Sequence, residues 1–443
     1  MARLGSAEMY LIRSIGRWTM TALVINGIIG AGIFALPGEL NRLLGRASPF
    51  AMIFAAMAMA IIMACITEVA SQFSEPGGAY LYTRTAFGRF VGMQTGWFFL
   101  LAVVGAVAVC ANIFVDYLAP FLSWTLNAWE RGLVMALLIA IPTAANYCGV
   151  RSGANLSSVM TLAKLSPLAL LILFGIAHFA HQPQMIHASE ISSPGWSNWV
   201  RAIVLLMFPL SGWEESLIPT GEVREPRRTI PFALATGLIT CAAVYTLLLF
   251  ITVATAGPNA TERPLAQAAS VLLGGGGATL VSIAVMLATY GYISANLLND
   301  SRLVYSLAAQ DDFPAIFGRI HPRFHTPAVA IIVYAFTGWA LAVSGTFQFV
   351  LALSAGATVV YYAGMCASLI RLRKLYPNAD ALRIPFGPLV SILAIAISLV
   401  LMTGLKRSEL LLMCVTALIA AANWLWVKRR HVEPEPKVQA HAC

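Results

Sequence analysis

Charged residues are scarce in this chain. Asp, Glu, Lys and Arg make up only 11% of its 443 residues, whereas about 25% is typical of soluble domains. Hydrophobic residues make up 59%, and the mean hydropathy is +0.78. This balance excludes a soluble globular protein, and repeated apolar runs of roughly 20 residues predict membrane-spanning helices.

Motifs for enzymatic chemistry are also missing. The sequence has no HExxH zinc helix, no GxSxG nucleophile elbow and no CxxC pair. Six of its seven cysteines lie in or beside apolar runs, the seventh ends the chain, and none has metal-ligand spacing. We therefore expect no enzymatic activity, no metal and no cofactor.

The apolar runs predict an all-α polytopic membrane protein with twelve transmembrane helices. An even number places both termini on one side of the membrane. On that side lie 20 of the 28 Lys and Arg residues, which predicts cytoplasmic termini in the cell membrane. Because topology accounts for the net charge of +9, no nucleic-acid partner is expected. The predicted spans are 18–40, 48–71, 90–120, 130–148, 155–178, 199–220, 231–256, 278–306, 327–345, 347–370, 385–405 and 408–427.

Two of these spans contain residues that interrupt helices. The first carries NGIIGAGIFALPG (Asn26–Gly38), with four glycines and a proline, and the sixth carries LLMFPLSGWEES (Leu205–Ser216). A broken helix survives in hydrocarbon only where protein or a cavity satisfies its free backbone groups. Interrupted helices at corresponding positions of two repeats indicate a substrate site near the membrane midplane. Close helix packing through small residues is the alternative.

Five motifs in order resemble the amino acid–polyamine–organocation (APC) superfamily of transporters. The resemblance implies a LeuT-like fold of two inverted five-helix repeats, at 17–180 and 197–372, with two additional helices at 385–427 and a disordered tail at 431–443. The motifs are GIIGAGIF (Gly27–Phe34), TEVASQFSEPGGAYLY (Thr67–Tyr82), FGRFVGMQTGW (Phe87–Trp97), FPLSGWE with EVREPRRTIP (Phe208–Glu214, Glu222–Pro231), and SRLVYSLAAQDDFPAIFGRIHPRFHTP (Ser301–Pro327).

The resemblance also implies which backbone groups hold an α-amino acid. Unwinding at Gly30 and Gly32 frees the amides that begin the second half-helix, and their positive partial charge suits a carboxylate. The amides of Ala31, Gly32 and Ile33 would bind that carboxylate. The carbonyls of Ile28, Phe208, Pro209 and Ser211 would accept hydrogen bonds from the ammonium, beside Gly212, and the Phe208 ring would cover the substrate.

Two ionisable residues within the predicted spans are candidates for proton coupling. A lone lysine within a membrane helix is costly, so Lys164 in the fifth span is a candidate for proton coupling. The alternative is a permanently charged ammonium bonded to first-span carbonyls, which would favour an exchanger. Glu214 is either a structural carboxyl that ties helices together or a second proton-coupling residue.

Other polar residues give weaker indications. Asn296 lies on a polar face of the eighth span with Tyr292 and Asn299, and it is a candidate substrate contact. Glu68 and Asp300 lie near the cytoplasmic ends of their spans, where pairing with basic loop residues is expected. No carboxylate can be assigned to a substrate side chain, which favours neutral amino acids.

The sequence thus predicts a secondary active transporter of L-amino acids working by alternating access, with proton-coupled symport favoured. An obligatory exchanger and a non-transporting sensor with the same site are the alternatives. The lipid bilayer and a small amino acid are the expected partners. The outer loop at 121–130 lacks cysteine, so no disulfide-linked heavy chain is expected, and a homodimer stays open.

Overall fold

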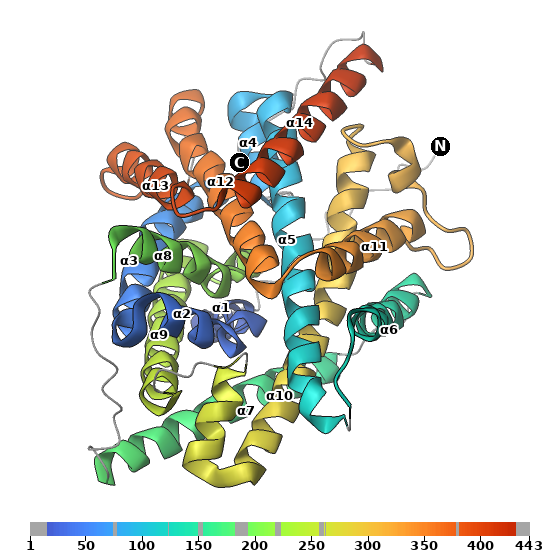
Figure 1. Cartoon of the computed structure of the whole chain (residues 1–443). Helices are drawn as coiled ribbons and strands as arrows, with labels where there is room; N and C mark the ends of the chain where they lie inside the picture. The colour runs from blue at the N-terminus through green and yellow to red at the C-terminus, as the bar shows by residue number, and fades with distance from the viewer. Residues whose placement is uncertain are drawn as a thin grey trace, which may run out of the picture.

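The computed structural model describes residues 16–73, 78–122, 124–148, 154–181, 194–217, 223–256, 261, 263–377 and 381–430. Every regular element among them is helical, which confirms the all-α prediction for this part of the chain (Figure 1). The predicted tail at 431–443 lies outside the described residues. The α-helices are α1 (Arg17–Ile28), α2 (Leu36–Leu44), α3 (Ser48–Ala70), α4 (Gly78–Phe87), α5 (Arg89–Leu118), α6 (Ala128–Tyr147), α7 (Ala154–His181), α8 (Trp196–Leu210), α9 (Pro226–Ala256), α10 (Pro264–Ala309), α11 (Ala328–Ser344), α12 (Phe347–Leu375), α13 (Gly387–Met402) and α14 (Arg407–Arg430).

Seven helical stretches of the described chain are long and apolar enough to cross a membrane. The other predicted spans fall on α1, which is broken from α2, on α7, and on the short helices α8, α11 and α13. The chain is therefore a polytopic membrane protein. The seven stretches are Leu36–Ala70, Arg89–Phe121, Ala128–Tyr147, Arg227–Thr255, Pro264–Ala309, Phe347–Leu375 and Arg407–Arg429.

The core of the bundle forms around α5, which runs through the centre of Figure 1 and packs most extensively against α12 and α10. The outer faces of the peripheral helices are apolar instead of charged. Phe54, Leu389, Leu411 and Leu418 are each more than half exposed. An apolar exterior of this kind matches a lipid environment, because hydrocarbon does not reward polar side chains.

Helix α10 consists of two helical pieces that meet at a kink at Gly274, where φ is 75°. The second piece contains the eighth span predicted at 278–306. Few residues other than glycine adopt a positive φ readily. Gly274 therefore lets the chain change direction between the two pieces.

Candidate functional site

The first interruption separates α1 from α2. Helix α1 ends at Ile28, Gly30 is extended with φ −98° and ψ −164°, and a short 3₁₀ helix, η1 (Ala31–Phe34), leads into α2. No side chain caps the start of η1 at Gly30. The first amides of a helix have no partner within it, so the break presents free backbone donors. The interruption predicted from the glycines is therefore present.

The second interruption follows α8. This helix ends at Leu210, Ser211 is extended, and Gly212 has φ +92° before the 3₁₀ helix η5 (Trp213–Leu217) begins. Pro209 lies in the last turn of α8, where a proline removes a backbone donor and weakens the helix. The sixth predicted span is thus broken where its sequence indicated.

The two interruptions meet backbone to backbone. A Cβ added to Gly27 would lie 2.5 Å from the Gly212 carbonyl oxygen, and a Cβ added to Gly212 would lie 2.5 Å from the Gly27 carbonyl oxygen. Contacts shorter than 3.0 Å are essentially absent for real Cβ atoms, so neither position accepts a side chain without movement. The glycines allow two broken helices to bring their free polar groups to one place.

A second contact between the two segments involves the aromatic side chain of Phe208. Its ring atoms would lie 2.6 and 2.8 Å from a Cβ at Gly32, and Pro209 would lie at 3.1 Å. Phe208 is 7% exposed, and Ile28 and Ile33 are buried beside it. The ring therefore lies against the first break, in the place that the resemblance gives to an aromatic cover.

Two tyrosines bind carbonyls at the first break, and neither was predicted from the sequence. Tyr245 Oη of α9 donates to the Ile28 carbonyl at 2.9 Å, and the same carbonyl accepts from the Gly30 amide at 2.7 Å. Tyr117 Oη of α5 donates to the Phe34 carbonyl at 2.8 Å. A substrate ammonium would therefore have to share or displace the donors that now occupy the Ile28 carbonyl.

The Phe208 carbonyl is also engaged. It accepts from the Ser211 amide at 3.2 Å and from Ser211 Oγ at 2.7 Å. The hydroxyl can rotate away, since a side-chain donor is less constrained than a backbone amide. Ser211 could thus release one lone pair of this carbonyl to a bound ammonium.

Glu214 joins the second break to α12. Its Oε2 accepts from the Gly212 amide at 2.9 Å and from Tyr362 Oη at 3.0 Å, and its Oε1 accepts from Tyr361 Oη at 2.7 Å. Three donors on one carboxyl satisfy a backbone group that the break would otherwise leave unpaired. This arrangement matches the structural role considered for Glu214 in the sequence.

The structure describes the side chains of some of the remaining predicted residues but not of others. Asn296 is 4% exposed on α10, and its neighbour on that face, Tyr292, would approach a Cβ at Gly30 to 3.6 Å. The polar face of α10 therefore reaches the first break. Lys164 lies in α7, but its side chain is outside the described residues, as are those of Ala31 and Asn299.

A polar cavity of about 420 Å³ lies beyond the first break. Its lining includes Ala35, which follows η1, and Asn112 of α5. Glu39 accepts from Gln348 Nε2 at 2.7 Å, and Asp116 pairs with Arg131 at 2.7 Å within the same lining. Charged and polar side chains thus line a cavity that begins at the end of η1.

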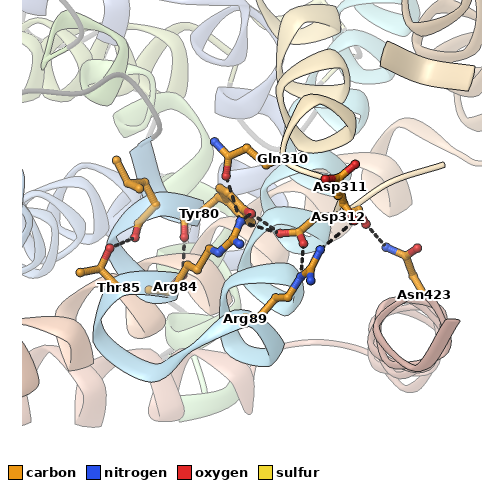
Figure 2. A network of polar contacts seen from close by, with 10 residues as sticks. Tyr80, Arg84, Thr85, Arg89, Gln310, Asp311, Asp312 and Asn423 are labelled. Carbon is orange, nitrogen blue, oxygen red and sulfur yellow. Dashed lines mark hydrogen bonds and ion pairs between the residues drawn. The ribbon is translucent and has the colours of Figure 1, made fainter. Parts of the chain in front are cut away.

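A cluster of polar side chains lies just beyond the C-terminal end of α10. Asp312 is buried and pairs with Arg89 Nε of α5 at 2.5 Å and with Arg84 Nη1 of α4 at 3.1 Å. Figure 2 shows both guanidinium groups converging on this carboxylate. Tyr80 Oη also donates to Asp312, and the Asp312 carbonyl accepts from Asn423 of α14 at 2.8 Å. We call these five residues the Asp312 cluster.

Burial of Tyr80 in the cluster raises the pKa of its phenol above the ordinary value, and the adjacent Asp312 carboxylate raises that pKa further. The phenol therefore stays protonated and continues to donate. The Asp312 cluster thus holds α4, α5 and α14 against the segment that follows α10.

A second ion pair confirms the expectation for Glu68. Its carboxylate accepts from Arg373 Nε at 2.6 Å and Nη2 at 2.7 Å, and from the Ile384 amide at 2.9 Å. Asp300 accepts from Tyr334 Oη at 2.9 Å, a contact that the sequence did not predict. The Glu68 pair fastens α3 to α12 and to the segment that precedes α13.

Comparisons of the sequence with known proteins identify its family. The family model described as "Amino acid permease" matches residues 15–436. The serine/threonine exchanger SteT of Bacillus subtilis is 26% identical over 87% of this chain and 89% of its own length. The glutamate/serine transporter AimA of the same organism is 23% identical over 74% of this chain and 67% of its own length. A methylthioribose transporter of B. subtilis is 23% identical over 95% of this chain and 94% of its own length. The chain belongs to the amino acid permease family of the APC superfamily.

Proposed function

We propose that this protein is a secondary active transporter that binds L-amino acids at the paired breaks and moves them by alternating access. The observation that carries the proposal is the mutual contact of Gly27 and Gly212, which brings free backbone donors of η1 next to the carbonyls that end α1 and α8. Donors suit the carboxylate of an amino acid, and carbonyls suit its ammonium. The relatives named as amino acid transporters support this substrate class.

The proposal includes twelve spans, with inverted repeats at 17–180 and 197–372 and two further helices at 385–427, and cytoplasmic termini. In this arrangement the carboxylate is bound by the amides of Ala31, Gly32 and Ile33. The ammonium takes the carbonyls of Ile28, Phe208, Pro209 and Ser211, beside Gly212, and Asn296 contacts the substrate from α10. The described carboxylates near the breaks already have partners, Glu214 among them, which favours a neutral substrate side chain.

Two coupling modes follow from different observations. Proton symport follows from Lys164, an ionisable residue inside α7 that could exchange a proton as the first span moves. Obligatory exchange is favoured by the similarity to SteT, whose printed name is that of an exchanger. A sensor that binds without transporting would retain the same contacts.

Uptake into proteoliposomes separates these modes. Labelled serine, threonine and a panel of other amino acids would be offered with and without an inward proton gradient, and with the vesicles empty or filled with unlabelled substrate. Symport predicts uptake that rises with the gradient in empty vesicles. Exchange predicts uptake that requires internal substrate, and a sensor predicts binding without flux. Uptake of methylthioribose with no amino acid flux would contradict the proposed substrate class.

A further inference from the structure

An apolar groove runs along the outer side of α3 and α9. Its larger part, about 590 Å³, is lined by Ile53, Met57 and Ala60 of α3 and by Leu238 of α9. A smaller part of about 170 Å³ shares Ala60 and Leu238 and continues to Thr67 and Ile384. From residue 53 to residue 67 α3 rises about 21 Å, which exceeds the roughly 15 Å of one leaflet's hydrocarbon. The groove is long enough for an acyl chain.

The groove ends at a basic surface. Arg227, Pro231, Leu234 and Leu238 follow one another at spacings of four, three and four residues, so they lie on one face of α9. Pro231, Leu234 and Leu238 line the groove, and Arg227 comes one turn earlier, near the N-terminus of this 31-residue helix. The apolar stripe therefore leads to a positive charge and to the positive end of a helix dipole.

Further arginines surround that end of the groove. Arg224, Arg227, Arg228 and Arg383 are exposed, and Arg383 lies between two groove residues in sequence. Among the described residues, Glu225 is a distant partner of Arg228 at 3.9 Å, with both side chains at least three-quarters exposed, and Glu68 lines a small pocket with Arg383 but is bound to Arg373. We call Arg224, Arg227, Arg228 and Arg383 the basic patch.

Aromatic side chains mark the same level of the membrane. Trp18 and Phe232 pack edge to face at 5.4 Å, and the Arg17 guanidinium lies 5.6 Å from the Phe232 ring. Trp18 is 63% exposed and Phe232 36%. Exposed aromatic rings beside arginines are typical of the interface between hydrocarbon and headgroups.

We propose that the groove binds one acyl chain of an anionic phospholipid and that Arg227 and Arg228 hold the lipid's phosphate. Only a molecule with an acyl chain and an anionic headgroup matches an apolar groove that ends at arginines. A free phosphate would leave the groove unfilled. A second copy of this chain packed about a two-fold axis along the membrane normal would bring two basic patches to the same side, where they repel.

The lipid would contact α9, the helix that packs against α1 beside the first break. A Cβ at Gly237 of α9 would lie 2.5 Å from the Val24 side chain of α1, so these helices touch closely. Tyr245 of the same helix holds the Ile28 carbonyl. An acyl chain against the outer face of α9 therefore restrains the helix that positions the end of α1.

Lipid retention in detergent tests the site without any transport measurement. Purified protein would be incubated with phosphatidylglycerol or phosphatidylcholine of identical chains, and bound lipid counted by native mass spectrometry. We expect preferential retention of phosphatidylglycerol, and a loss of about fivefold for each arginine removed in R227Q and R227Q/R228Q. R429Q, an exposed arginine at the end of α14, is the matched control and should retain the lipid.

A second pair of variants tests the groove itself. A60F fills the place where its two parts join, whereas A396F adds the same ring to an exposed alanine of α13. We expect A60F to lose retention severalfold and A396F to keep it. Equal retention of the two lipids, R227Q/R228Q binding like R429Q, or A60F binding like A396F would overturn the proposal. If A60F does not fold, short-chain phosphatidylglycerol replaces it as the probe, and binding as tight as that of the long-chain lipid contradicts the groove.

Discussion

The Gly27 and Gly212 backbones touch across the two interrupted helices, each occupying the space that a side chain of the other would need. Gly27 is helical, and Gly212 has φ +92°. At Gly27 the contact requires only that there is no side chain. At Gly212 it requires both that there is no side chain and that the backbone adopts a positive φ. This difference allows the contact and the conformation to be tested separately.

We expect Gly27→Ala to reduce transport at least about tenfold, because its methyl group would push the second break away from the first. Gly212→Ala should reduce transport further, because alanine at a positive φ adds about 1–3 kcal/mol of strain. Initial uptake rates in proteoliposomes, normalised to the amount of folded protein, measure both effects.

Gly45→Ala is the matched control for strain alone. Gly45 has φ +52° and nothing within 4 Å of an added Cβ. It should lower the free energy of unfolding by a similar amount, about 1–3 kcal/mol, and leave uptake near the wild-type rate. Wild-type uptake by Gly27→Ala would contradict the account of the contact.

The Glu214 carboxyl is expected to act as a structural acceptor. Glu214→Ala would leave the Gly212 amide and two tyrosine hydroxyls without a partner, at a cost of about 1–3 kcal/mol for each buried group left unpaired. Glu214→Gln retains an acceptor of similar size and should keep most of the stability. Thermal unfolding in detergent compares the two variants.

The pH dependence of uptake distinguishes the two roles of Glu214. A structural carboxyl predicts that Glu214→Gln transports with the wild-type pH profile. If the variant loses its response to a proton gradient while it still binds substrate, Glu214 is a proton-coupling residue instead.

The proton-coupling role of Lys164 has a sharper test. Lys164→Ala should bind amino acid but lose the stimulation of uptake by a proton gradient, because the alanine side chain cannot take up or release a proton. Lys406→Ala, which changes a lysine just before α14, is the control. Unchanged gradient dependence in Lys164→Ala would remove the coupling hypothesis and favour exchange.

Breaking the Asp312 cluster should lower the free energy of unfolding. Asp312 is fully buried, whereas the Arg84 and Arg89 side chains are 32% and 23% exposed, so Asp312→Ala removes the shared partner of two partly exposed charges, at about 1–3 kcal/mol. Glu225→Gln removes one partner of an exposed pair and should cost less than about 1 kcal/mol. Thermal unfolding tests this difference, and equal losses in the two variants would contradict it.

Alkaline pH should weaken the same region. Burial raises the pKa of Tyr82 from 10.0 to about 12, so its phenol holds a proton that the unfolded chain releases from about pH 10 upward. The unfolded state then binds fewer protons, and stability falls as pH rises between 10 and 12. Stability measured from pH 8 to 12 should fall less steeply in Tyr82→Phe, and an identical slope would contradict this reading.

The interruptions could be predicted from the sequence because the physics is local. Four glycines and a proline within one apolar run weaken a helix wherever it lies, and the membrane requires that the freed groups be satisfied. The pairing of the two breaks followed from their positions in the two halves. The close contact between Gly27 and Gly212 could be found only from the structure, because it depends on how α1 approaches the end of α8.

The groups that hold the breaks could not be predicted in this way. A tyrosine such as Tyr245 or Tyr117 in a membrane helix carries no local sign of the carbonyl it will bind, since its partner lies far away in the chain. Asp312 lies within a recognisable motif, but Arg84 and Arg89 come from more than 200 residues earlier. Such long-range pairs depend on the packing of α4, α5 and α10.

A determined structure with a bound amino acid tests the central claim most directly. Protein saturated with a substrate identified in the uptake assay should show that molecule between η1 and the end of α8. Its carboxylate should lie within hydrogen-bond distance of the amides of Ala31, Gly32 and Ile33, and its ammonium near the Ile28 and Phe208 carbonyls. A substrate bound elsewhere, or first and sixth helices that run unbroken through the membrane centre, would contradict the account.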